Sequence, residues 1–218
     1  ETPVVSTETS IPIPTLIKTS TQVPPTITPT ATNTAIPMLP TMTPTPAVNY
    51  RIYGVNLGPY LYDDPNLGAY ITESDLRSLI EKVAPYTTSI RTFGCGNGLD
   101  KAARIAHEFG LTIAAGAWLG KDLAANETEI NCLINLANNG DLLNSDLAVI
   151  GNETLLRGDL TEGELLIYIN RFKAEVPWVP VTSSESWTNI EKNRDLISLI
   201  DVVAVNVYPY WDNTQIDR

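Results

Sequence analysis

The sequence predicts an α/β fold with a parallel sheet, arranged as an incomplete (β/α)8 TIM barrel of about six βα units. Three observations support this prediction. Short apolar runs alternate with amphipathic stretches along residues 49–218, and the pattern repeats about every thirty residues. The uninterrupted apolar run at residues 147–150 is typical of a parallel strand that is buried on both faces. Residues 1–48 lack the alternation and form a separate segment.

Segments with the composition of strands are rich in apolar and β-branched residues and are bounded by turn residues. In chain order we predict strands at residues 51–56, 89–93, 112–118, 147–152, 180–184 and 201–208.

Helices are predicted between these strands, because apolar residues recur there every three or four positions. They cover residues 72–84, 99–109, 122–138, 161–174 and 189–199. Thr72 is placed to cap the first helix, and Gly110 is placed to end the second in the left-handed conformation. Thr161 and Glu164 have the spacing of a capping box at the start of the fourth.

The number of βα units is too small for a closed barrel, which needs about 250 residues. We therefore expect the seventh and eighth units to follow the end of this sequence. An open doubly wound sheet is the alternative, since it needs no closure. Against it, Gly54, Gly58 and Gly68 lack the G-x-G-x-x-G spacing of a dinucleotide-binding turn.

Residues 1–48 hold most of the prolines and no aromatic residue. Such a segment has too little apolar area to offset the entropy of ordering, so we predict a disordered Thr/Pro-rich linker before a domain at 49–218. Thr-Pro repeats are typical of extracellular stalks. We expect an extracellular or cell-surface protein whose export signal is not in this sequence. A remnant of expression or of gene prediction is the alternative reading of the segment.

The formal net charge of −11 argues against nucleic acid or an anionic membrane surface as a partner, and a neutral glycan fits better. No apolar run is long enough to span a membrane. Cys95 and Cys132 form neither a disulfide framework nor a metal site, and their spacing does not decide whether they pair. We expect no metal and no cofactor.

The pair Asn152-Glu153 follows the apolar fourth strand directly. The carboxyl ends of barrel strands carry the chemistry in this fold. A carboxyl at the rim of an apolar sheet is partly desolvated, and this favours the protonated form that a general acid needs. The Asn amide can bind a substrate hydroxyl without competing for the proton. The pair therefore indicates cleavage of a glycosidic bond, and a Glu that merely caps the next turn is the structural alternative.

Aromatic and polar residues gather at the ends of the other predicted strands. In a barrel these ends share one face, where rings can stack on sugars and amides can bind their hydroxyls. The residues are Tyr53, Asn56, Arg91, Phe93, Trp118, Glu185, Trp187, Asn206, Tyr208, Tyr210 and Trp211.

At residues 150–157 the sequence IGNETLLR resembles the fourth-strand motif of the microbial branch of glycoside hydrolase family 17, the β-1,3-glucanases. Further segments are similar to this family in the same order. They are YGVNLGPY at 53–60, IRTFG at 90–94, GAWLG at 116–120 and VNVYPYW at 205–211.

The resemblance implies a secreted (β/α)8 enzyme that hydrolyses β-1,3-glucan with retention. It implies that Glu153 is the catalytic acid and base, that Asn152 contacts the sugar 2-hydroxyl, and that Tyr208 lines the cleft. The family's nucleophile is a Glu in a Glu-x-Gly-Trp-Pro-like motif, which this sequence lacks and which should follow Arg218. We therefore expect the fragment 49–218 to be nearly inactive.

We predict further substrate contacts from Tyr53, Asn56, Arg91, Trp118 and Glu185. Glu185 lies on the strand next to Glu153, so it is expected beside the acid, either as a subsite residue or as a partner that raises its pKa. The remaining alternative is that Glu185 is the nucleophile. The expected partner is a β-glucan, and the protein is expected to be a monomer. A glycan-binding module without catalysis and a β-glucan transglycosylase are the alternative functions.

Overall fold

The computed structural model describes residues 51–60 and 68–211. The predicted linker at 1–48 lies outside the described residues, so its disorder stays a prediction. Within the described residues no helix is both long and apolar enough to cross a bilayer.

The described residues form one parallel sheet in which every strand pairs with the next one in the chain. Its strands are β1 (Val55–Asn56), β2 (Ser89–Arg91), β3 (Thr112–Ala117), β4 (Leu147–Asn152), β5 (Val181–Ser186) and β6 (Ala204–Asn206). A sequential strand order is that of a barrel wall, whereas a doubly wound sheet reverses its order near the middle. The prediction of an incomplete TIM barrel is therefore confirmed, and the doubly wound alternative is wrong.

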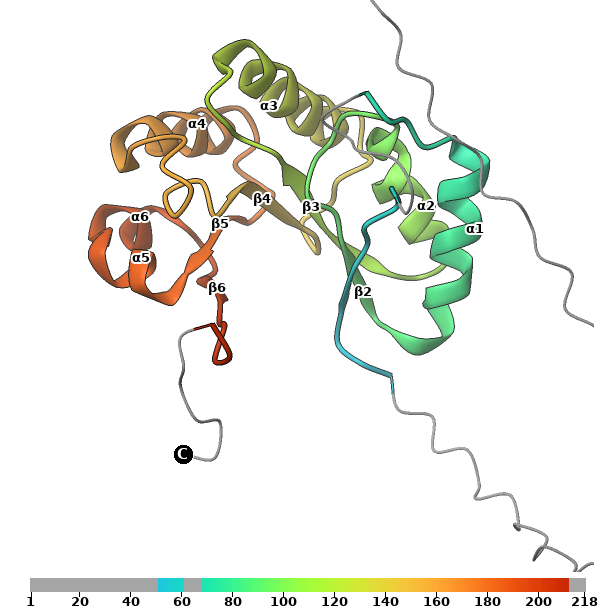
Figure 1. The fold of residues 1–218 in the computed structure, drawn as a ribbon. Coiled ribbons are helices and arrows are strands. Elements are labelled where there is room, and N and C mark those ends of the chain that lie inside the picture. Colours follow the sequence, from blue (N-terminus) through green and yellow to red (C-terminus); the bar gives the residue numbers. More distant parts are fainter. Residues whose placement is uncertain (1–50, 61–67, 212–218) are drawn as a thin grey trace, which may run out of the picture. The chain divides into compact units, whose positions relative to one another are not determined.

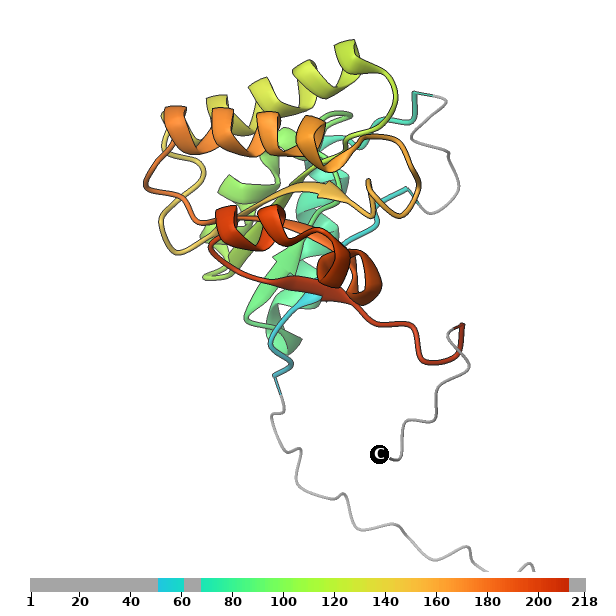
Figure 2. The same cartoon turned by 90° about the vertical axis from the view of Figure 1, so that its left-hand side faces the viewer.

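The helices lie along one side of the curled sheet (Figure 1), with α1 and α2 near β2 and β3, and α5 and α6 near β5 and β6. Figure 2 shows α3 and α4 running side by side over the sheet, and the two helices contact each other. The helices are α1 (Glu73–Val83), α2 (Ala102–Glu108), α3 (Leu123–Asn138), α4 (Glu162–Glu175), α5 (Trp187–Lys192) and α6 (Arg194–Leu199), with short 3-10 turns η2 (Ala84–Tyr86) and η3 (Leu99–Lys101).

The predicted helix ends are present. The Thr72 hydroxyl accepts the N–H of Asp75 at the start of α1, and Thr161 and Glu164 form the capping box of α4. Gly110 ends α2 in the left-handed conformation, with φ of +70°.

The predicted helix at 189–199 is wrong in one respect. The chain forms two short helices, because Asn193 between them has φ −108° and ψ 78°, which is not helical. Its side-chain Nδ2 donates to the carbonyl of Asn189 at 2.7 Å. An Asn that bonds to a nearby backbone group competes with the helix in this way.

The core fills the space between the sheet and the helices. It is built from the apolar face of each helix and from the outward residues of the strands, as the helical periodicity predicts. Its largest fully buried side chains include Leu76, Ile80, Ile113, Ile150 and Phe172. This layer fixes the strands, and the strands in turn fix the loops at their carboxyl ends.

Cys95 and Cys132 form a disulfide with a Cα–Cα separation of 6.0 Å. The bond joins the loop after β2 to α3. The pairing that the sequence left open is thereby decided.

Candidate active site at the carboxyl ends of the strands

A distorted backbone delivers Glu153 from the end of β4. The register between β4 and β5 shifts between Val149 and Asn152, and Gly151 in this bulge has φ of +80°. Glu153 itself has φ of +54°, a left-handed conformation that is uncommon for a residue with a side chain. Its N–H donates to the carbonyl of Ser184 on β5 at 2.7 Å. Strained backbone of this kind is concentrated at functional sites, where surrounding contacts hold it in place.

Two side chains from the region of β6 hold the Glu153 carboxylate. The hydroxyl of Tyr208 donates to Oε1 of Glu153 at 2.5 Å, and Nδ2 of Asn206 donates to the same oxygen at 2.9 Å. The pKa of Tyr208 is raised, first by this hydrogen bond, and then by burial and the charge of Glu153. The contacts fix the direction of the carboxylate in the half-buried space between β4 and β6.

Asn152 is held by a guanidinium. Nη2 of Arg91 donates to Oδ1 of Asn152 at 2.8 Å, and the Arg91 group stands over the ring of Phe93 at 4.9 Å from the ring centre. Because its oxygen accepts this bond, the Asn152 amide is oriented with its N–H₂ group away from Arg91. The pKa of Arg91 is lowered by burial, and the charges of Tyr208 and Glu153 offset only part of this effect. The predicted residues Arg91, Asn152, Glu153 and Tyr208 therefore lie in one network.

Arg157 links this network to Trp118. Its guanidinium lies 4.4 Å from the centre of the Trp118 ring, and its Nη2 donates to the carbonyl of Leu119 at 2.7 Å. Its Nη1 donates to the carbonyl of Asn152. The side chain thus joins the ends of β3 and β4. Trp118 is 41% exposed, so part of its ring is free for a ligand.

Two pockets flank the network. One of about 370 Å³ lies beyond β1, β2 and β3, where its lining includes Pro59, Tyr60, Phe93, Leu99, Trp118 and Glu129. The other, of about 490 Å³, lies beyond β4, β5 and β6 and is lined by Leu156, Ser186, Trp187, Thr188, Tyr208 and Trp211. Trp118 connects the network to the first pocket, and Tyr208 connects it to the second. An elongated ligand could therefore extend to both sides of Glu153.

Glu185 lies on β5 next to the strand that carries Glu153, as the sequence analysis expected, but its carboxylate binds backbone groups of the protein. Its side chain is fully buried, and its carboxylate accepts the backbone N–H groups of Leu155 at 2.9 Å and Leu156 at 3.4 Å. Burial raises the pKa of Glu185, and the two backbone bonds and Arg157 oppose this. The expected contact with substrate is therefore wrong, because the carboxylate is buried and binds the backbone of the loop after β4. The alternative role, a partner that raises the pKa of the acid, stays a prediction.

Tyr53 is also misplaced by the sequence analysis. Its carbonyl accepts the hydroxyl of Thr88, a residue that precedes β2, and its side chain is 90% exposed. Tyr53 therefore lies near the amino ends of the strands, away from Glu153. Asn56 is exposed at the carboxyl end of β1, opposite Arg91 in the register, so its predicted contact with substrate stays a prediction.

The sequence predicts no specific role for three residues that bind groups at the carboxyl ends of the strands. The sequence places Asn206 among the strand-end residues without a specific contact, and it contains Arg157 only as the final residue of the IGNETLLR motif. Glu129 on α3 carried no signal, since acidic residues are common on helices. In the part of the chain that the structure describes, no three potential metal ligands come together.

Comparisons with known proteins match this chain to a glycoside hydrolase family. A family model described as the BtgE/BtgC glycoside hydrolase domain matches residues 54–218. No curated protein matches the sequence.

Among solved structures, the glycoside hydrolase family 17 β-1,3-glucanosyltransferase from Rhizomucor miehei has a TM-score of 0.62 at 24% identity. The match covers 76% of this chain and 60% of that chain. An active-site mutant of that enzyme in complex with laminaritriose matches with the same values. A β-D-glucuronidase from Dictyoglomus thermophilum has a TM-score of 0.50 at 17% identity, over 75% of this chain and 30% of that chain. At these identities the structural matches show the shared fold.

Proposed function

This chain belongs to the family of the BtgE/BtgC glycoside hydrolase domain, and on that premise we propose that it acts on the O-glycosidic bonds of β-1,3-glucan with Glu153 as the catalytic acid and base. The observation that carries the proposal is the Glu153 carboxylate itself. It projects from the end of β4 in a left-handed backbone conformation, and Tyr208 and Asn206 direct it.

The proposed chemistry begins with proton transfer from Glu153 to the glycosidic oxygen. The bond between that oxygen and the anomeric carbon breaks as a nucleophilic carboxylate bonds to the carbon. Glu153, now ionised, then takes a proton from water or from a sugar hydroxyl. The resulting oxygen displaces the nucleophile and leaves the anomeric configuration retained.

Asn152 is proposed to bind the 2-hydroxyl of the sugar at the reacting centre. The contact with Arg91 supports this role, because the guanidinium donates to Oδ1 of Asn152 and leaves the N–H₂ group to donate to a sugar. Hydrogen bonds to the 2-hydroxyl strengthen as an oxocarbenium-like transition state forms. Arg91 is thus proposed to orient Asn152, and Trp118 to stack on a neighbouring sugar.

Glu185 is not proposed as the nucleophile. Retention requires two carboxyl groups roughly 5 to 5.5 Å apart on opposite sides of the bond that breaks. Glu185 is buried, and its oxygens are engaged by the backbone of Leu155 and Leu156. Among the described residues we assign no other carboxyl as the nucleophile, and we propose that residues 49–218 alone turn over glucan hardly at all. The chain spans about 60% of the Rhizomucor miehei enzyme, so the activity of the whole protein is part of this proposal.

Transfer to a sugar is the second candidate reaction. It is favoured by one observation, the match in fold to a β-1,3-glucanosyltransferase. In transfer a sugar hydroxyl replaces water in the second step, and every residue named here keeps its role.

We propose that the protein is exported and works as a monomer at the cell surface or outside the cell. The Cys95–Cys132 disulfide supports export, because such bonds persist in oxidising compartments. The Thr/Pro-rich residues 1–48 would then form a spacer, in keeping with their composition.

Product analysis tests this function. The full-length protein is incubated with reduced β-1,3-gluco-oligosaccharides of defined length, and the products are separated by size. Shorter products alone indicate hydrolysis, and products longer than the substrate indicate transfer. β-1,4-linked oligosaccharides serve as the control for linkage. The proposal fails if β-1,3-linked substrates remain intact or if β-1,4-linked ones are cleaved equally well.

A further inference from the structure

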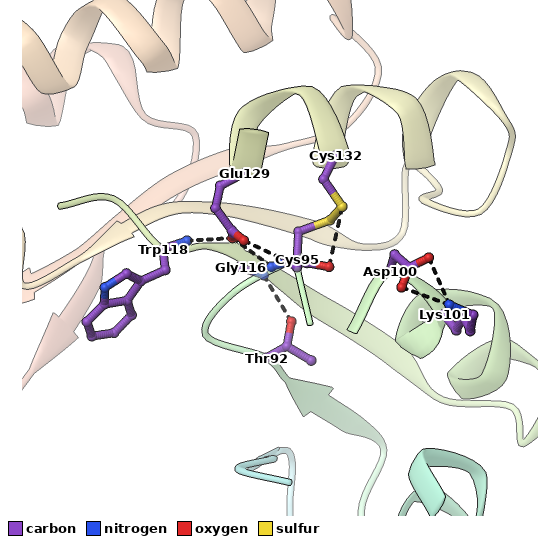
Figure 3. Close-up of a disulfide and its surroundings, with 9 residues drawn as sticks. Thr92, Cys95, Asp100, Lys101, Gly116, Trp118, Glu129 and Cys132 are labelled. Atoms are coloured by element: carbon purple, nitrogen blue, oxygen red, sulfur yellow. Dashed lines mark hydrogen bonds and ion pairs between the residues drawn. A yellow bond between two sulfur atoms is a disulfide. The ribbon is translucent and has the colours of Figure 1, made fainter. Parts of the chain in front are cut away.

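Two side chains of α3, Glu129 and Cys132, bind the loops that follow β2 and β3. The disulfide joins Cys132 to Cys95, and Glu129, three residues before Cys132, reaches the same loop. Figure 3 shows both side chains pointing from α3 toward Cys95, with the ring of Trp118 turned away from the carboxylate. The loop after β2 is therefore held by a covalent bond and by a charged group.

One carboxylate accepts three backbone N–H groups from two different loops. Oε2 of Glu129 accepts the N–H of Cys95 at 2.7 Å and that of Trp118 at 3.0 Å, and Oε1 accepts the N–H of Gly96 at 2.8 Å. Hydrogen bonds to an ionised acceptor are stronger than bonds between neutral groups. Glu129 therefore connects the end of β2 to the end of β3 through the helix between β3 and β4.

The glycines of the loop fit this carboxylate closely. A Cβ at Gly96 would stand 2.7 Å from Oε1 of Glu129, and one at Gly94 would stand 3.2 Å from Oε2. The first distance is shorter than van der Waals contact permits, so a side chain at position 96 would displace the carboxylate from its present place, whereas one at position 94 would need only a small adjustment. The loop is thus shaped around Glu129.

The same loops form the pocket of about 370 Å³, whose lining includes Phe93, Trp118 and Glu129. We propose that Glu129 is a positioning residue, which holds the loops after β2 and β3 so that the Trp118 ring and the Phe93 ring are preorganised to stack on a sugar. The disulfide at Cys132 supports the same loop. The part that concerns the sugar rests on the proposed function, whereas the part that concerns the loops does not.

The inference is tested with Glu129→Gln and Glu129→Ala in the full-length protein. Gln keeps one carbonyl oxygen as an acceptor, whereas Ala keeps none, so the two effects should be graded. Glu127→Gln is the matched control. Glu127 lies on the same helix and pairs with Arg171 at the surface, away from these loops.

Amide hydrogen exchange reports on the loops directly. We expect exchange at Cys95, Gly96 and Trp118 to become about tenfold faster in Glu129→Gln and faster still in Glu129→Ala, because each variant removes acceptors for these N–H groups. Exchange in the core of β4 should not change. Unchanged exchange at the three amides would overturn the positioning role.

Kinetics with β-1,3-gluco-oligosaccharides report on the pocket. KM should rise by about five- to tenfold in Glu129→Gln with kcat within about twofold, because a stacking site that does not touch the reacting bond mainly contributes uniform binding. A fall in kcat with KM unchanged would overturn the role in the pocket. If the wild type does not act on glucan, the proposed function fails, and the exchange measurement still decides whether Glu129 holds the loops.

Discussion

The hydroxyl of Tyr208 donates a hydrogen bond of 2.5 Å to Oε1 of Glu153, a residue 55 positions earlier in the chain. The bond joins the segment after β6 to the end of β4, across the end of β5. Asn206 on β6 binds the same oxygen. The direction of the proposed acid therefore depends on the correct assembly of three adjacent strands.

Replacement of Glu153 should alter the titration of Tyr208. The pKa of Tyr208 is raised mainly by its hydrogen bond to Glu153, and the charge of that residue adds to the effect. Glu153→Gln removes the charge and weakens the bond, so the pKa of Tyr208 should fall toward its ordinary value of 10.0. The measurement is NMR titration of tyrosines labelled with ¹³C at Cζ, with Tyr208→Phe to assign the resonance.

Tyr60 is the internal control for this titration. Its raised pKa is caused mainly by burial and then by Glu129 and Tyr70, so Glu153→Gln should leave it unchanged. A Tyr208 pKa that stays as high in Glu153→Gln as in the wild type would contradict Glu153 as the main cause of the raised value.

Gly151→Ala should destabilise the protein by about 1 to 3 kcal/mol. Gly151 has φ of +80°, and a Cβ there would stand 2.6 Å from Oγ1 of the buried Thr154. Either the bulge or the loop after β4 must then move, so the proposed acid should also be displaced and activity should fall. Urea unfolding of the two proteins measures the change in the free energy of unfolding.

Gly163→Ala is the matched control for this substitution. Gly163 lies in the first turn of α4, and no heavy atom would meet its Cβ within 4 Å. Ala favours a helix over Gly, so this variant should be as stable as the wild type or more stable by up to about 1 kcal/mol. Equal losses in the two variants would contradict the account of the bulge.

Tyr60 should make stability fall at alkaline pH. Burial, with the charges of Glu129 and Tyr70, raises its pKa from 10.0 to about 12. Because the fold favours the neutral hydroxyl, this contribution to stability is complete below pH 10 and disappears as the pH rises from 10.0 through about 12.

Tyr60→Phe cannot ionise, so its free energy of unfolding should fall less steeply than that of the wild type over this range. Urea midpoints of both proteins at several pH values from 8 to 12 provide the comparison. Parallel decreases in the two proteins would exclude a contribution from Tyr60.

The sequence predicted the elements well because their signals are local. The apolar run before Asn152 and the capping box at Thr161 each depend on a few neighbouring residues, and both are present as expected. The order of strands and helices then brought Glu153, Arg91 and Tyr208 to one face. The parallel sheet explains this part of the site, because all its strands end at the same edge.

The misassigned residues depend on contacts that no local pattern encodes. Glu185 is buried because the loop after β4 folds over it and supplies two backbone donors. Tyr53 was expected at a strand end, but β1 begins only at Val55. Glu129 contacts loops that are 11 and 34 positions away in the sequence, so its spacing carries no periodic signal.

Glu153→Gln tests the central claim most directly. The substitution keeps the size of the side chain and its contact with Asn206 but removes the proton that the reaction needs. In the full-length protein, loss of a general acid and base is expected to lower kcat/KM toward β-1,3-gluco-oligosaccharides by about 10²- to 10⁴-fold, with the fold intact by circular dichroism. Glu191→Gln, at an exposed position on α5, is the control and should keep full activity. Activity within twofold of the wild type in Glu153→Gln would contradict the assignment of this carboxyl as the acid and base.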